Sequence, residues 1–144
     1  MNDALLIRAP VGVAYRTLTD LDGWPRWLPG CRSVRLPGAA EGHDRHALSL
    51  VDGRRRWRIG VDVHGWRHDL GVRWDVRGAV VLTSEWWLES RTEGTIVHHV
   101  VHGSPVGRRA ERRVRHHRAV VMGAMQAMKD HLELAVALAD GRTP

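Results

Sequence analysis

The chain has 144 residues, enough for one domain with a substantial core, and we expect a single domain over 1–144. Its net charge of +6 admits an acidic partner, but no helix-turn-helix, zinc-finger or aromatic RNA-binding pattern accompanies the charge, which argues against nucleic acid. Apolar runs end well before the roughly 20 residues of a membrane-spanning helix, and the N-terminus lacks a basic start followed by an apolar run. We therefore expect a cytoplasmic protein without a membrane span.

The aromatic content is biased toward tryptophan, with seven Trp, one Tyr and no Phe. Indole rings must therefore supply the aromatic packing, and several of them can line a pocket as readily as fill a core. Cys31 is the only cysteine, so the chain has no internal disulfide and no cysteine-based metal site. We expect a buried or pocket-lining thiol.

The N-terminal part combines one strand with two short helices. Residues 4–7 form an apolar run that predicts a strand, and Pro10 then stands at the first turn of a helix. Apolar residues recur at helical spacing over 11–21, which predicts that helix. The proline-containing segment 24–30 predicts a short, turn-like second helix.

The middle of the chain lacks a long helical period and consists of short runs separated by glycine or charged turns, which predicts an antiparallel meander. We expect its strands at 33–36, 45–51, 55–64, 70–77, 79–90 and 95–102. In two of these strands, apolar and polar side chains clearly alternate, so that one face is apolar. The apolar residues are Trp57, Ile59, Val61 and Val63 in one strand, and Leu70, Val72, Trp74 and Val76 in the next.

After Pro105 the period changes to about 3.6 residues and persists to 140, which predicts a helix of roughly 30 residues. Such a helix can bury its apolar stripe only against the apolar face of the sheet. Arg118 is the polar exception in the predicted stripe. The stripe comprises Val114, Arg118, Val121, Met125, Met128, Leu132 and Ala135.

Particular residues carry a family resemblance over nearly the whole chain. They are Ala9-Pro10, the stretch TDLDGWPRWLPG at 19–30, Glu85-Trp86-Trp87-Leu88 followed by Glu93-Gly94-Thr95, and the Met-rich final helix. With this order of elements, the chain resembles the polyketide cyclase and lipid-transport group of the START-like superfamily, nearest to single-domain aromatase/cyclases. The resemblance implies an α+β helix-grip fold: a curved seven-stranded antiparallel sheet around a long C-terminal helix, with two short helices after the first strand.

The same resemblance implies a function, although one scaffold of this kind serves several. We expect a polyketide cyclase or aromatase-like enzyme that binds a small hydrophobic intermediate in an internal cavity and needs no cofactor. The alternative is a non-catalytic carrier of a lipid, quinone or aromatic metabolite. Trp24 matches a tryptophan of the pocket mouth in these enzymes. Their pocket arginine has no clear match, because Arg58 falls on the face opposite its apolar neighbours.

Ring closure requires proton transfer next to a carbonyl group, for which histidine and arginine are suited. By alternation, His46 and His99 lie on apolar strand faces, so both are candidate catalytic residues. A structural histidine, or a register shifted by one residue, is the other interpretation. Arg118 is the third candidate, although its long stem can also reach water.

Large apolar side chains are the candidate ligand-binding residues: Trp24, Trp27, Trp57, Trp74, Trp86 and Met125. A methionine at this position is ordinarily core, but thioether chains also adapt to irregular ligands. We expect no metal site, because adjacent histidines diverge on a strand or a helix.

Arginines gather at the start of the last helix: Arg108, Arg109, Arg112 and Arg113. They are either a solvated face or a surface that attracts an acidic acyl carrier protein, in which case binding weakens as salt rises. The sequence is compatible with a monomer or a homodimer.

Overall fold

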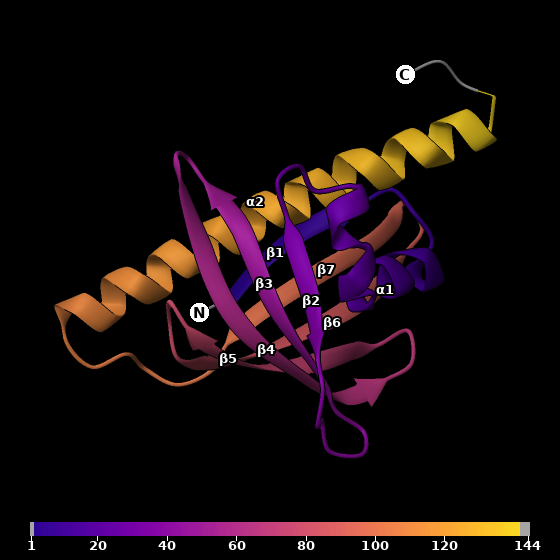
Figure 1. The fold of residues 1–144 in the computed structure, drawn as a ribbon. Helices are drawn as coiled ribbons and strands as arrows, with labels where there is room; N and C mark the ends of the chain where they lie inside the picture. The colour runs from indigo at the N-terminus through magenta and orange to yellow at the C-terminus, as the bar shows by residue number, and fades with distance from the viewer. Residues whose placement is uncertain (1, 142–144) are drawn as a thin grey trace.

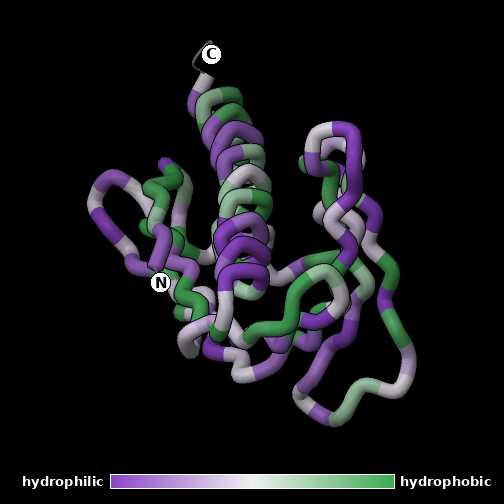
Figure 2. The backbone as a smooth tube through the Cα atoms, turned by 90° about the vertical axis from the view of Figure 1, so that its left-hand side faces the viewer, coloured by the Kyte–Doolittle hydropathy of each residue, from purple (hydrophilic) through white to green (hydrophobic). Residues whose placement is uncertain are grey.

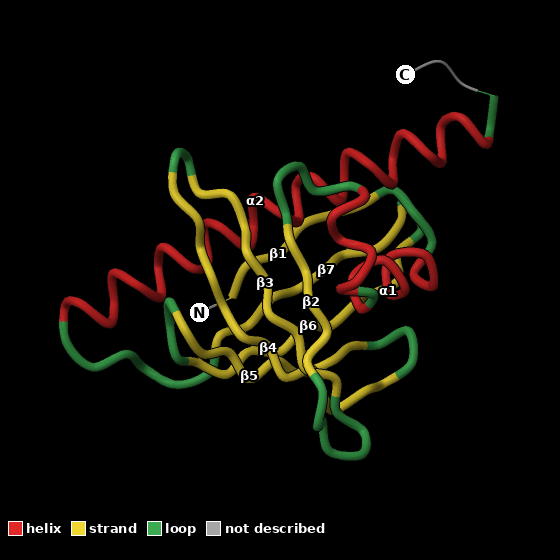
Figure 3. The backbone as a smooth tube through the Cα atoms, in the orientation of Figure 1, coloured by secondary structure: helices red, strands yellow, loops and turns green. Residues whose placement is uncertain are grey.

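The computed structural model describes residues 2–141 and contains seven strands and three helical segments (Figures 1 and 3). The strands are β1 Asn2–Ile7, β2 Arg32–Leu36, β3 Asp44–Asp52, β4 Arg55–Arg67, β5 Gly71–Gly78, β6 Leu82–Arg91 and β7 Gly94–Val101. The helices are α1 Val11–Thr19, the 3₁₀ helix η1 Leu21–Arg26 and α2 Arg108–Ala139. The predicted α+β fold and element order are confirmed.

The sheet is antiparallel throughout, in the order β1-β7-β6-β5-β4-β3-β2. Consecutive strands from β2 to β7 are neighbours, as expected for a meander, and β1 adds to the far edge beside β7. In Figure 1 the sheet curves, and α2 crosses one side of it with both ends projecting beyond the strands. The curved sheet and α2 enclose the core.

One face of the sheet is turned inward. Ile59, Val61 and Val63 of β4 are all at most 3% exposed, and the register places Val63 opposite Trp74 of β5. The expected apolar face of this strand is therefore confirmed. Leu70 is a correction: it lies in the turn before β5 and is 57% exposed, because β4 continues past Gly65 and the chain reverses only after Arg67.

Helix α2 packs its apolar stripe on the inner face of the sheet. The buried members are Val114, His117, Val121, Ala124, Met125, Met128 and Leu132. The prediction was wrong for two residues of this stripe, because Ala135 is exposed and Arg118 is only partly buried. The inward position belongs to His117. Figure 2 shows hydrophobic and hydrophilic residues alternating along the helix.

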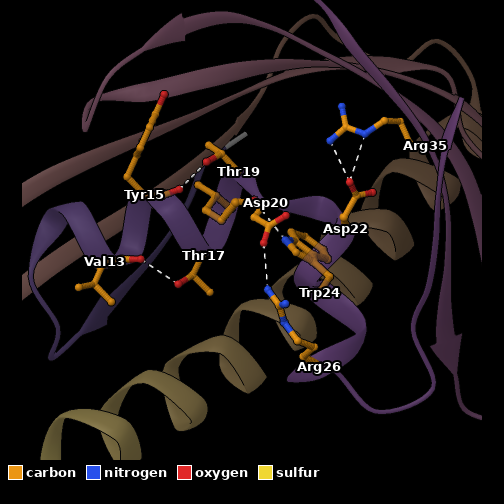
Figure 4. Close-up of polar contacts among 10 residues, drawn as sticks. Val13, Tyr15, Thr17, Thr19, Asp20, Asp22, Trp24, Arg26 and Arg35 are labelled. Carbon is orange, nitrogen blue, oxygen red and sulfur yellow. Dashed lines mark hydrogen bonds and ion pairs between the residues drawn. The ribbon is translucent and has the colours of Figure 1, made fainter. Parts of the chain in front are cut away.

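Helices α1 and η1 lie together at one end of the sheet (Figure 1). Pro10 precedes α1, and its carbonyl accepts hydrogen bonds from the amides of Val13 and Ala14. The second helix begins earlier than predicted, at Leu21. Inside it, the buried indole of Trp24 donates to the carbonyl of Leu18 over 3.1 Å (Figure 4).

Two further strand bounds differ from the sequence-based expectation. β6 begins at Leu82 rather than at 79, because the chain turns outward there and leaves Val81 81% exposed. β1 begins at Asn2 rather than at 4. Within residues 2–141, no helix is both long enough and apolar enough to span a membrane.

Candidate functional site

A continuous row of aromatic rings runs through the interior between the sheet and α2. Centroid distances are 5.2 Å from Trp27 to Trp24, 5.8 Å from Trp24 to Trp74, and 5.2 Å from Trp74 to Trp86. The row ends at His99, whose ring stacks on Trp86 at 4.2 Å. Trp24, Trp74 and Trp86 are at most 1% exposed, so these predicted ligand-binding residues fill the core next to the histidine.

His99 is a buried, neutral histidine on β7. Its side chain is 1% exposed, and neither ring nitrogen has a hydrogen-bond partner within residues 2–141. Burial lowers its pKa to about 3; His117 and the positive charge of Arg118 act in the same direction, and Asp3 opposes them. The ring is therefore uncharged at neutral pH, with one N–H donor and one nitrogen acceptor available.

His117, on α2, is a functional candidate that the sequence analysis did not single out. Its side chain is fully buried, and its ring centroid lies 6.2 Å from that of His99. Trp57 Nε1 donates to His117 Nδ1 over 3.0 Å. Because an indole nitrogen only donates, Nδ1 carries no proton and the neutral ring is protonated at Nε2.

The proton on His117 Nε2 has no acceptor within residues 2–141. Burial, with a smaller contribution from His116, lowers the pKa of His117 to about 4, so this ring is also neutral near pH 7. Trp86 Nε1 and the hydroxyl of Ser84 are likewise buried without a partner in this part of the chain. Polar atoms left unpaired in an interior cost free energy, and a ligand with hydrogen-bonding groups would satisfy them.

Arg118 lies beside this cluster but is paired with β1. Its Nε and one terminal nitrogen donate to the two carboxylate oxygens of Asp3 over 2.9 and 3.1 Å. The register sets Asp3 directly opposite His99. The structure therefore brings His99, His117 and Arg118 together around β1 and β7, with the arginine held by a bidentate ion pair.

His46 lies apart from the other candidates. It is on β3, which β4, β5 and β6 separate from β7 in the sheet. Its Nδ1 is 3.4 Å from a carboxylate oxygen of Asp22, a side chain that also accepts from Arg35 over 2.9 and 3.1 Å (Figure 4). Burial lowers the pKa of His46, and Asp22 opposes that effect. His46 therefore belongs to a polar group at the η1 end of the sheet.

Two hollows open where the β3–β4 hairpin meets α2. One, of about 400 Å³, is lined by residues including Leu28, Leu50 and Val120, and the other, of about 450 Å³, has Trp57 in its wall. Asp52 and His116 line both hollows and are joined by a 2.6 Å contact between them. Because Trp57 also bonds to His117, the second hollow is one side chain away from the buried histidines.

The remaining predicted residues have defined places. Met125 is fully buried in the α2 stripe, and Trp27 is partly buried at the outer end of the aromatic row. Cys31 is buried, as expected, and burial raises the pKa of its thiol to about 11. Arg58 is exposed, on the face opposite Trp57. Among residues 2–141, no three His, Cys, Asp or Glu side chains are grouped to hold a metal ion.

Comparison with known families and structures bears on this site. The model of the family described as "Polyketide cyclase / dehydrase and lipid transport" matches residues 3–137. A comparison with curated protein sequences finds no match.

Solved structures share the fold at low identity. The di-domain ARO/CYC StfQ from the steffimycin biosynthetic pathway has a TM-score of 0.72 and 16% identity; the match covers 95% of this chain but 51% of StfQ, so this chain spans about half of that protein. TTHA0849 from Thermus thermophilus has a TM-score of 0.71 and 17% identity, covering 94% and 97% of the two chains. The Zhui aromatase/cyclase from Streptomyces sp. R1128 has a TM-score of 0.65 and 13% identity, covering 99% and 98%. The chain belongs to the polyketide cyclase/dehydrase and lipid transport family.

Proposed function

We propose that this protein binds a small hydrophobic polyketide-type intermediate between the sheet and α2 and assists its ring closure or dehydration. The observation that carries the proposal is His99, a fully buried imidazole at the end of a row of tryptophans, with both nitrogens unpaired within residues 2–141. The family and the aromatase/cyclase structures of the same fold support the general type of activity.

The chemistry follows from the protonation states. Ring closure removes a proton next to one carbonyl group and leaves negative charge on that oxygen. His117 presents Nε2–H as a donor that can stabilise this enolate oxygen, as an oxyanion hole does. His99 offers its unprotonated nitrogen to accept the proton. The enolate forming beside it favours the imidazolium and offsets the effect of burial.

Arg118 and His46 take different parts in this proposal. Arg118 assists through its position beside His99, where its bidentate ion pair with Asp3 holds the guanidinium in place. His46, held near Asp22, assists only if the intermediate extends along the aromatic row toward Trp24. Trp24, Trp27, Trp57, Trp74, Trp86 and Met125 shape the apolar space.

A carrier without catalysis is the second candidate, and one observation favours it. A histidine with a pKa of about 3 is a weak base, so its unpaired nitrogens also suit simple hydrogen bonding to a bound metabolite. In that case the ligand is a lipid, quinone or aromatic compound, and no proton is transferred.

A product profile separates the two candidates. A carrier-protein-bound polyketide chain is allowed to react with the wild-type protein, with His46→Gln/His99→Gln and with no protein, and ligand retention is measured alongside. Enzymatic activity predicts a product that only the wild type yields. Identical products in all three reactions, with the ligand still retained by both proteins, would establish a carrier.

We further propose an acidic acyl carrier protein as partner, docking on Arg108, Arg109, Arg112 and Arg113. All four side chains are exposed at the start of α2. Steering between opposite charges weakens with ionic strength, so binding of the carrier protein should fall steadily in a salt titration. Salt-independent binding would exclude this surface.

A further inference from the structure

The hollow beside Trp57 has a composition that the proposed interior chemistry does not require. It is walled by Asp52, Arg55, Arg56, Trp57, Ala79, Arg112, Arg113 and His116. Four arginines from two separate elements thus line one hollow of about 450 Å³, against a single carboxylate. Like charges brought this close repel one another unless an anion lies between them.

Only some of the arginines that line this hollow form hydrogen bonds with other parts of the protein. Arg56 donates to the carbonyl of Gly30 and the hydroxyl of Ser49, over 2.8 and 3.0 Å. The side chains of Arg55 and Arg112 make no hydrogen bond or ion pair with any other residue of 2–141, and both are exposed. They come from two different elements, one from β4 and one from α2.

The one carboxylate of the hollow is already engaged. Asp52 contacts His116 at 2.6 Å, and both residues line the two hollows. With the guanidinium of Arg56 bonded to Gly30 and Ser49, the other three arginines against one aspartate leave an excess of two positive charges. An excess of this size favours a doubly charged anion, and the planar guanidinium fork matches the oxygens of a phosphate group.

From this geometry we infer that the hollow between the β3–β4 hairpin and the start of α2 is a binding site for the phosphate of an organic phosphate ester. Arg55, on β4, and Arg112, on α2, bind the phosphate, and the apolar part of the ester lies against Trp57 and Ala79. The site goes beyond the proposed ring closure and does not depend on it, because neither His99 nor His117 lines the hollow; Trp57 touches both, through its hydrogen bond to His117. Arg112 and Arg113 also belong to the proposed docking surface for a carrier protein, and the phosphate site differs from that surface in including Arg55 and in selecting a small anion.

The test compares two double variants with equal loss of charge. Arg55→Gln/Arg112→Gln removes the two unpaired arginines of the hollow. Arg54→Gln/Arg115→Gln removes an arginine from the same hairpin and one from the same helix, neither of which lines the hollow. Calorimetry at constant salt measures the affinity for 1-naphthyl phosphate, inorganic phosphate, 1-naphthoate and 1-naphthol, and the melting temperature of each variant checks its fold.

We expect 1-naphthyl phosphate to bind the wild type most tightly of the four probes. Its affinity should fall at least roughly tenfold in Arg55→Gln/Arg112→Gln and less than about twofold in the control variant. An equal fall in affinity in both variants would show that general positive charge, and not this hollow, attracts the anion, and would overturn the proposal. Equal or tighter binding of 1-naphthoate, or no binding of the phosphate ester by the wild type, would overturn the phosphate assignment.

Discussion

Trp57 Nε1 donates a hydrogen bond to His117 Nδ1 over 3.0 Å, which decides the tautomer of a histidine 60 residues away in the chain. The bond leaves the remaining proton of His117 on Nε2, in the interior beside His99. Trp57 also stands in the wall of the arginine-lined hollow, so one side chain separates the surface from the buried pair. The proposed chemistry depends on this arrangement.

The tautomer itself is directly measurable. Long-range ¹H–¹⁵N NMR spectra at pH 7 should show His117 protonated at Nε2 and unprotonated at Nδ1, because Trp57 can only donate. Trp57→Phe keeps an aromatic ring and removes the donor, so it should release this constraint and raise the pKa of His117. Protonation at Nδ1 in the wild type would contradict the hydrogen bond.

Stability should decrease as pH falls below about 6.5. The pKa values of His99 and His117 are about 3 and about 4 in the folded chain, whereas an unfolded histidine titrates near 6.5. Between about pH 6.5 and pH 4 the unfolded state therefore binds more protons and is favoured. At pH 5 each histidine should cost about 2 kcal/mol in the free energy of unfolding relative to pH 8.

Glutamine variants isolate this effect in urea unfolding measured at several pH values. His99→Gln and His117→Gln should each flatten the dependence below pH 6.5, whereas His131→Gln, at an exposed position of α2, should leave it unchanged. If all three variants behave alike, the buried histidines are not the source of the acid sensitivity.

The aromatic row should contribute strongly to stability. Trp24 is fully buried, at 0% solvent exposure, and bonds to the carbonyl of Leu18. Trp24→Ala should lower the free energy of unfolding by about 3 to 5 kcal/mol. Trp66, which is 39% exposed and also bonds to a backbone carbonyl, is the matched control, and its replacement by alanine should cost about 1 kcal/mol. Similar losses in urea unfolding would argue against a packed row.

The ion pair between Arg118 and Asp3 should tie α2 to the edge strand β1. Both side chains are about a quarter exposed, so the coupling should be near 1 kcal/mol. Arg118→Gln and Asp3→Asn should each destabilise the protein, and the double variant should lose less than the sum of the two. Strictly additive losses in a double-mutant cycle would show that the pair contributes nothing.

Regular patterns explain why the fold follows from the sequence. Alternation in β4 sets Ile59, Val61 and Val63 inward, and the 3.6-residue period identifies α2. The same period does not separate His117 from Arg118. One lies three and the other four residues after Val114, so helical spacing places either on the inner stripe.

Contacts between distant parts of the chain decide what periodicity leaves open. Trp57, on β4, holds His117 inward, and Asp3, on β1, holds Arg118 at the edge. Leu70 shows the same limit in the sheet. Alternation places it in a strand, but β4 is longer than predicted, so Leu70 falls in the turn that follows and is exposed. The signal that could have identified His117 was its position three residues after Val114, which helical spacing places on the inner stripe.

The central claim is that a buried neutral histidine at the end of the tryptophan row drives ring closure. Its most direct test compares His99→Gln with His98→Gln. The two positions are adjacent on β7, but His98 stacks on Trp87 at 3.7 Å on the opposite face of the sheet. With a carrier-protein-bound polyketide chain, His99→Gln should slow formation of the cyclised product by roughly 100-fold or more, while His98→Gln retains it. Equal rates in both variants and the wild type, with the ligand still bound, would contradict the claim.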